Sequence, residues 1–156
     1  MTPRPLTLAD VVWPALMLEQ RLVSAIPIGV GLIAELLTLR FGGFGLSWKK
    51  AVLVDVVMNA VSTAAGIPVI PLLGLAWEVF PGSILYKHFN IGTFNPGSWT
   101  ATFVMATAAT TGIEAAVVRW GFKIALGRRR LAILGLANSV SVAIAFASLW
   151  LRPPRW

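Results

Sequence analysis

Three acidic residues stand inside long apolar runs, where a charged side chain is expensive. Glu35, Asp55 and Glu114 each have apolar neighbours on both sides. An ionisable side chain in hydrocarbon costs about 2.5 to 3.5 kcal/mol on insertion scales, so it normally faces a protein interior or a hydrated path. Asn59 and Asn138 place amide groups in similar surroundings. These five residues are the candidate ion- or proton-binding site.

Further polar residues continue this pattern along helical faces. Residues three or four positions apart share one face of a helix, and Asp55, Asn59 and Ser62 are spaced in this way. The residues that lead to Glu114 are spaced similarly, although threonines there can also bond to carbonyls of their own helix. The expected polar stripes comprise Ser62, Thr107, Thr110, Thr111 and Ser141.

Two other interpretations of the buried acids compete with ion binding. In the first, each Glu stays protonated and donates to an Asn or Ser on another helix, which holds the helices together at about 0.6 kcal/mol per bond. In the second, Glu35 and Glu114 are hydrated from the side of Arg40 and Arg119. Each arginine follows its glutamate by five positions, or about 7 Å along a helix.

Other kinds of chemistry are poorly represented in the chain. It has no cysteine, which excludes disulfides, thiolate metal sites and cysteine nucleophiles. Its only histidine, His88, has no cluster of further ligands, so we interpret it as an interfacial residue rather than a metal or haem ligand. Nucleophile-elbow, zinc-protease and phosphate-loop motifs are missing. We therefore expect no enzymatic activity, no cofactor and no metal site.

The composition indicates a membrane protein. Of 156 residues, 57% are hydrophobic and only 12% are charged, about half the charged share of a soluble domain. The net charge of +7 would suggest nucleic-acid binding in a soluble protein. Here the basic residues lie between apolar runs, where topology and anionic lipid headgroups explain them, so no nucleic-acid partner is expected. The chain is predicted to be a single integral membrane domain, residues 1–156.

Four apolar runs are long enough to cross a bilayer. Residues 8–20 mix apolar and charged side chains, which predicts an interfacial helix before the first run, and no cleavable signal peptide is expected. Pro68 and Pro71 are expected to break or bend the second helix, and Pro81-Gly82 is expected to form a turn beyond it. The predicted spans are residues 22–39, 51–77, 98–118 and 131–151.

The basic residues predict the orientation. Eight of the 13 lie in the two short connections 40–50 and 119–130, which contain no acid. The positive-inside rule places both connections in the cytoplasm and both termini on the outer side of an inner (plasma) membrane. The expected site for anionic headgroups is Arg128, Arg129 and Arg130, which can alternatively serve as a topology anchor.

An internal repeat relates the two halves of the chain. A shift of 79 positions superposes Glu35 on Glu114 and Asn59 on Asn138. Each half consists of a helix, a basic connection and a returning helix, which predicts parallel repeats about an axis along the membrane normal. The predicted fold is all-α, a transmembrane four-helix bundle of two helical hairpins, about 22–77 and 98–151, separated by an outer connection at 78–97. The shift also superposes Arg40 on Arg119, Gly42 on Gly121 and Ser62 on Ser141.

These features predict a small transport or channel module coupled to a proton or cation through its buried carboxylates. The alternative is a non-catalytic structural subunit or assembly factor of a larger membrane complex. Membrane lipids, copies of the same chain or other subunits of a complex are the expected partners.

Overall fold

A computed structural model describes residues 25–89 and 96–151, which contain helices and short connections but no strand. This confirms the predicted all-α class. The interfacial helix expected at residues 8–20 lies outside the described part of the chain. The elements are α2 (Ala25–Phe41), α3 (Trp48–Trp77), the π-helical segment η1 (Glu78–Gly82), α4 (Ser83–Phe89), α5 (Pro96–Ala116), the π-helical segment η2 (Val117–Gly121) and α6 (Arg128–Leu151).

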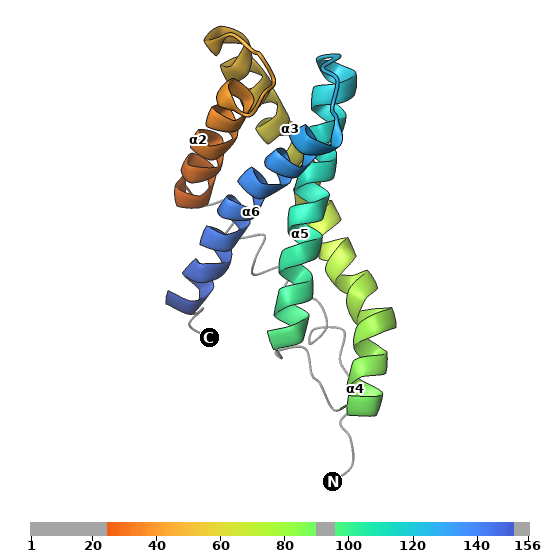
Figure 1. The fold of residues 1–156 in the computed structure, drawn as a ribbon. Coiled ribbons are helices and arrows are strands. Elements are labelled where there is room, and N and C mark those ends of the chain that lie inside the picture. The colour runs from red at the N-terminus through yellow and green to blue at the C-terminus, as the bar shows by residue number, and fades with distance from the viewer. Residues whose placement is uncertain (1–24, 90–95, 152–156) are drawn as a thin grey trace.

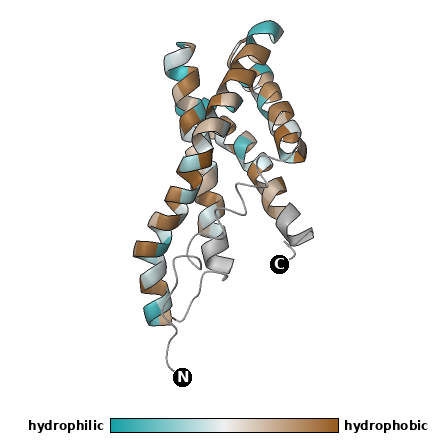
Figure 2. Ribbon diagram, turned by 180° about the vertical axis from the view of Figure 1, so that it is seen from behind, coloured by the Kyte–Doolittle hydropathy of each residue, from teal (hydrophilic) through white to brown (hydrophobic). Residues whose placement is uncertain are grey.

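Three helical stretches are long and apolar enough to cross a membrane: Trp48–Phe89, Thr100–Gly121 and Arg128–Ala147. Hydrophobic residues cover much of their length (Figure 2). The described part of α2 has 17 residues, shorter than the roughly 20 that a spanning helix needs. The second, third and fourth predicted spans therefore each have a counterpart, and the first is helical over its described part.

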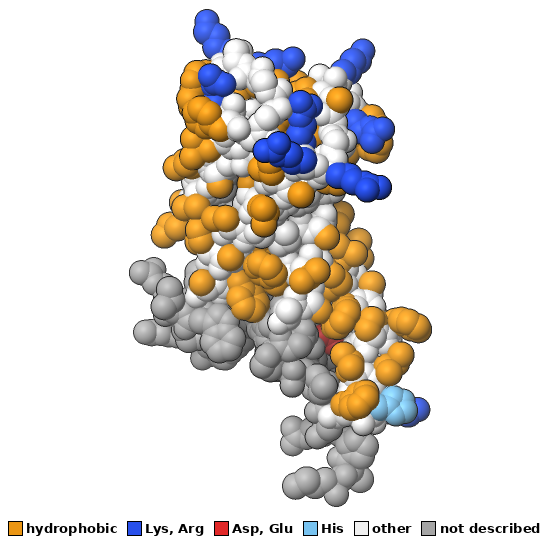
Figure 3. Space-filling view, in the orientation of Figure 1, with side chains coloured by type: hydrophobic (Ala, Val, Ile, Leu, Met, Phe, Trp, Pro, Cys, Tyr) orange, Lys and Arg blue, Asp and Glu red, His pale blue; other side chains and the backbone are white. Residues whose placement is uncertain are grey.

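The four long helices are neighbours in a closed order. Helix α2 contacts α3 and α6, and α5 likewise contacts α3 and α6. The α2–α3 and α5–α6 connections lie at one end of the molecule, and α4 lies at the other (Figure 1). Lysine and arginine side chains gather at the end that holds the connections, and apolar side chains cover the surface below them (Figure 3).

An apolar core lies at this connection end. Each of the four long helical stretches and both connections contribute to it. Because it spans the whole cross-section there, it separates the basic connections from the middle of the helices. Its buried members are Leu39, Phe44, Leu46, Ala51, Val54, Met58, Val118, Ile124 and Leu134.

The two connections are joined by Arg130. Its Nε donates to the Gly43 carbonyl at 3.1 Å and its Nη1 donates to the Ala125 carbonyl at 2.7 Å. The guanidinium also lies 5.6 Å from the centre of the Phe44 ring. Gly43 has a φ of +85°, a left-handed conformation that suits glycine and lets the first connection turn towards Arg130.

The break expected at Pro68 and Pro71 and the turn expected at Pro81-Gly82 do not occur, while a bend at Pro68 and Pro71 stays a prediction. Helix α3 runs through Pro68 and Pro71 without a break, because membrane helices can compensate locally for the donor that a proline removes. Pro81-Gly82 does not form a turn but lies in η1, which leads directly into α4. The helical stretch that begins at Trp48 therefore continues to Phe89, well into the segment expected to be a connection.

Candidate ion- or proton-binding site

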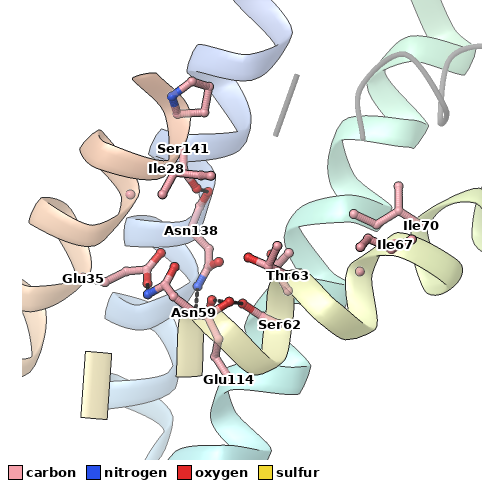
Figure 4. Close-up of a pocket in the computed structure, with 14 residues that line it drawn as sticks. Ile28, Glu35, Asn59, Ser62, Thr63, Ile67, Ile70, Glu114, Asn138 and Ser141 are labelled. Carbon is pink, nitrogen blue, oxygen red and sulfur yellow. Dashed lines mark hydrogen bonds between the residues drawn. The ribbon is translucent and has the colours of Figure 1, made fainter. Parts of the chain in front are cut away.

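The structure brings four of the five candidate residues together from all four long helices. Glu35 comes from α2, Asn59 from α3, Glu114 from α5 and Asn138 from α6 (Figure 4). Both glutamate side chains are only 1% exposed. The two halves of the chain thus supply one buried polar cluster.

The glutamates make matching hydrogen bonds. Asn59 Nδ2 donates to Glu35 Oε2 at 2.5 Å, and Asn138 Nδ2 donates to Glu114 Oε2 at 2.5 Å. Each asparagine follows its glutamate by 24 positions. Each half of the chain therefore makes the same acid–amide contact between its own two helices.

Ser62 links the two halves. Its Oγ lies 3.0 Å from Glu114 Oε1 and 3.2 Å from the backbone carbonyl oxygen of Asn59. A serine hydroxyl carries one proton and can also accept, so it donates to one of these oxygens at a time. When it donates to the carbonyl, a protonated Glu114 can donate to Ser62 Oγ. The geometry thus accommodates both the charged and the neutral form of Glu114.

A cavity of about 60 Å³ adjoins this cluster. Its inner wall includes the buried residues Glu35, Ser62 and Glu114, while exposed side chains such as Ile28 and Ile67 lie at its mouth. A polar cavity of this size can hold several water molecules. Its full lining is Pro27, Ile28, Gly31, Glu35, Asn59, Ser62, Thr63, Gly66, Ile67, Ile70, Thr110, Glu114, Asn138 and Ser141.

The cavity opens away from the basic connections. Along α2 its lining extends from Glu35 back towards Pro27, whereas the next turn in the other direction carries Leu39 of the apolar core. Met58 and Leu134, both fully buried, lie on the same inner side. The arrangement does not favour hydration of the glutamates from the side of their flanking arginines.

No known protein family, curated protein or solved structure matches this chain.

Asp55, the fifth candidate, does not line the cavity. It is 3% exposed and lies one turn before Asn59, whose Nδ2 approaches its Oδ1 at 3.4 Å. A shift of 79 positions pairs Asp55 with Leu134, a member of the apolar core. Asp55 is thus a polar exception at a position that is apolar in the other half.

The threonines of the expected polar stripe separate into two groups. Thr110 lines the cavity and its Oγ1 bonds back to the Ala106 carbonyl at 3.0 Å. Thr107 and Thr111 do not line it, and the buried Oγ1 atom of each has no hydrogen-bond partner among the described residues. Of the three, only Thr110 therefore contributes to the site.

Several lining residues were not predicted, and Gly31 is the most informative. A Cβ at Gly31 would lie 3.0 Å from Ser141 Cβ, so a glycine lets α2 approach α6 closely. Gly31 pairs with Thr110 under the 79-position shift, and both line the cavity. Applying the repeat to every position of the polar stripe would have identified Gly31.

The donor set is poorly suited to a divalent or transition-metal ion. Within residues 25–89 and 96–151, no three His, Cys, Asp or Glu side chains come together as metal ligands. Both asparagines turn their amide nitrogens towards the carboxylates, and such N–H groups cannot coordinate a cation. His88 lies in α4, away from this cavity, so it does not supplement the site.

The three expected headgroup residues also differ from one another. Arg128 and Arg129 are exposed at the connection end. Arg130 is half-buried and its donors reach the two backbone carbonyls described above. Its contacts are those of a structural link between connections.

Proposed function

We propose that this protein is a small membrane transport or channel module in which Glu35 and Glu114 bind a proton or a monovalent cation. One observation carries the proposal: two glutamates from different helices, each 1% exposed, line one cavity. Buried acids of this kind are typical of proton and ion pathways.

The cavity favours this function over purely structural hydrogen bonding. An acid that only joins helices needs a hydrogen-bond partner on another helix, as Glu114 has in Asn138, but it needs no cavity beside it. Glu35 Oε1 has no such partner among the described residues, although Oε2 of the same carboxylate accepts from Asn59. The cavity beside Glu35 gives its Oε1 atom access to a proton, a cation or water, any of which would satisfy it.

The proposed architecture is a bundle of four spanning helices built from two parallel repeats. The matching Glu–Asn contacts support it, as does the order of neighbours, because exchanging the two hairpins turns the α2–α6 contact into the α5–α3 contact. A cavity on the axis between the repeats is where a parallel-repeat transporter binds its substrate.

We propose that the protein lies in the inner membrane with its basic connections on the cytoplasmic side. Lys49 and Lys50 begin α3, and Arg128 and Arg129 begin α6. Positive charge at a helix N-terminus is unfavourable, so these residues need an explanation other than helix stability. Topology and anionic headgroups provide one. We also propose that the protein self-associates in the membrane.

The test is a flux assay in proteoliposomes that contain an internal pH indicator. An imposed membrane potential drives protons into the vesicles. The measurement is repeated with a different monovalent cation in the external solution each time. We expect flux from the wild type, a loss of roughly tenfold or more in Glu35→Gln and Glu114→Gln, and wild-type flux in Glu78→Gln, whose carboxylate lies outside the cavity. Absence of flux from the wild type under all these conditions would contradict the proposal. If that chain also purified with stoichiometric partner proteins, the structural-subunit alternative would be favoured.

A further inference from the structure

We propose that the substrate is a primary alkylammonium ion, with its ammonium group between Glu35 and Glu114 and its alkyl chain leaving between α2 and α3. This inference rests on the proposed function and names the substrate class of the same site.

The polar wall offers acceptors that match a primary ammonium group. Glu35 Oε1 has no hydrogen-bond partner among the described residues, and Glu114 Oε1 contacts only the Ser62 hydroxyl, which can reorient towards Asn59. A primary ammonium carries three N–H donors around one point. Glu35 Oε1, Glu114 Oε1 and Ser62 Oγ can accept them, while both Oε2 atoms keep their asparagines.

The positive charge of the ammonium group also matches the negative charge of the two carboxylates. Two carboxylates in one buried site are costly together, and one fixed positive charge offsets much of that cost. If the pair holds a proton before the amine arrives, the incoming cation displaces it to water. Binding of the amine and release of the proton are then two sides of one exchange, which is the coupling that the proposed transport requires.

The lining discriminates between kinds of ammonium. Aromatic cages recognise quaternary ammonium groups, but none of the described lining residues is aromatic. A quaternary group also has no N–H to donate to the carboxylates. The volume of about 60 Å³ accommodates a small head group rather than a bulky ring system.

The mouth of the cavity suits an alkyl chain. Ile28 on α2 is 37% exposed and Ile67 on α3 is 54% exposed, and both line the cavity. Ile28 is seven positions from Glu35, or about 10 Å along the helix, so the opening is offset from the acids by the length of a medium alkyl chain. An amphipathic amine could therefore keep its chain in the bilayer while its head group reaches the carboxylates.

The test measures binding of three probes with the same chain length to the purified full-length protein in detergent: n-octylammonium, n-octyltrimethylammonium and n-octanol. We expect saturable binding of n-octylammonium in titration calorimetry, accompanied by proton release into a weakly buffered solution. The trimethylammonium probe should bind at least about tenfold more weakly, and n-octanol should show only partition into micelles. Equal binding of all three probes would overturn the proposal.

Variants separate recognition at the site from loss of folding. Glu35→Gln and Glu114→Gln should each weaken n-octylammonium at least about tenfold, and Glu78→Gln should leave it unchanged. Ile67→Trp alters an exposed side chain at the mouth, so it should weaken n-octylammonium without lowering thermal stability. Unchanged affinity in both glutamate variants or in Ile67→Trp would contradict the assigned site.

The proposed function and this inference fail in different ways. Glutamate-dependent proton or cation flux without n-octylammonium binding would refute the amine substrate and leave the transport function standing. Stoichiometric, glutamate-dependent amine binding without flux under any gradient, including one of the amine itself, would refute transport and leave a binding site.

Discussion

Ser62 and Glu114 are 52 positions apart in the sequence, yet Ser62 Oγ lies 3.0 Å from Glu114 Oε1. This contact connects the first half of the chain with the second. Ser141, which matches Ser62 under the shift of 79 positions, bonds to the Asn138 carbonyl in its own helix, as Ser62 does to the Asn59 carbonyl, but within the described residues it makes no hydrogen bond to a glutamate. The two halves therefore share a pattern of residues but differ in how their serines are used.

Replacing Ser62 with Ala should destabilise the protein, whereas replacing Ser141 with Ala should have little effect. Ser62→Ala removes a contact between α3 and α5, and hydrogen bonds between membrane helices contribute about 0.6 to 1.7 kcal/mol. Ser141→Ala removes a bond within one helix turn. Thermal unfolding in detergent, followed by circular dichroism, measures the difference. Equal melting temperatures for the two variants would show that the link between the halves contributes nothing.

Gly31→Ala should loosen the contact between α2 and α6. The new Cβ would lie 3.0 Å from Ser141 Cβ, and neither atom can rotate away, so one helix has to shift. Overpacking of this kind costs about 1 to 3 kcal/mol. Gly29→Ala is the matched control, because no atom of the described residues lies within 4 Å of a Cβ there, and it should be neutral or slightly stabilising. If Gly31→Ala unfolds at the wild-type temperature, the two helices are not closely packed at this point.

Much of this site could be predicted because a shift of 79 positions pairs residues that are far apart in the sequence. The shift pairs Glu35 with Glu114 and Asn59 with Asn138, and these four residues meet at one cavity. The apolar runs located most ends of the long helices to within a few residues because spanning a bilayer requires a minimum length, but the helical stretch of the second run continues to Phe89.

Other features depend on how far along the bundle a residue lies and on which helix it faces. The helical period of a sequence does not encode either property. Thr107 and Thr111 share a spacing with Thr110, but only Thr110 reaches the cavity. Asp55 fits the stripe of Asn59 and yet lies one turn closer to the apolar core. The turn expected at Pro81-Gly82 failed for a related reason, since a local proline rule does not account for the π-helical segment that accommodates both residues.

Asp55→Leu should make the protein more stable while preserving the amine site. Asp55 is 3% exposed, and a single 3.4 Å approach from Asn59 is the only hydrogen bond to its side chain within the described residues. Removing so poorly compensated an acid should raise the free energy of unfolding by about 1 to 3 kcal/mol. Amine affinity should persist because Asp55 does not line the cavity.

The mirror variant is Leu134→Asp, which places a second acid at the matching position of the other half. Leu134 is fully buried in the apolar core, so this variant should be strongly destabilised. Unfolding by chemical denaturant and titration of n-octylammonium measure stability and binding separately. A less stable Asp55→Leu variant would reveal a structural role for the acid that its contacts do not explain.

Arg130→Ala should destabilise the connection end, whereas Arg129→Ala should mainly weaken binding to anionic lipid. Arg130 reaches the Gly43 and Ala125 carbonyls and stacks on Phe44, so its loss separates the two connections. Bonds from a charged donor contribute about 1.5 to 3 kcal/mol when buried, and the exposure of this site reduces that to about 1 kcal/mol. Arg129 is exposed, and a basic residue near an anionic surface contributes about 1 kcal/mol to binding.

Thermal unfolding in neutral detergent and retention of fluorescent anionic lipid during purification measure these two effects separately. In neutral detergent the Arg129→Ala variant should have the melting temperature of the wild type, because there is no anionic headgroup for Arg129 to contact. The Arg130→Ala variant should melt earlier in neutral and anionic detergent alike, since its partners are carbonyl groups of the protein itself. If instead both variants lose anionic lipid equally and melt alike, Arg130 serves the membrane surface, and the contact between the connections is incidental.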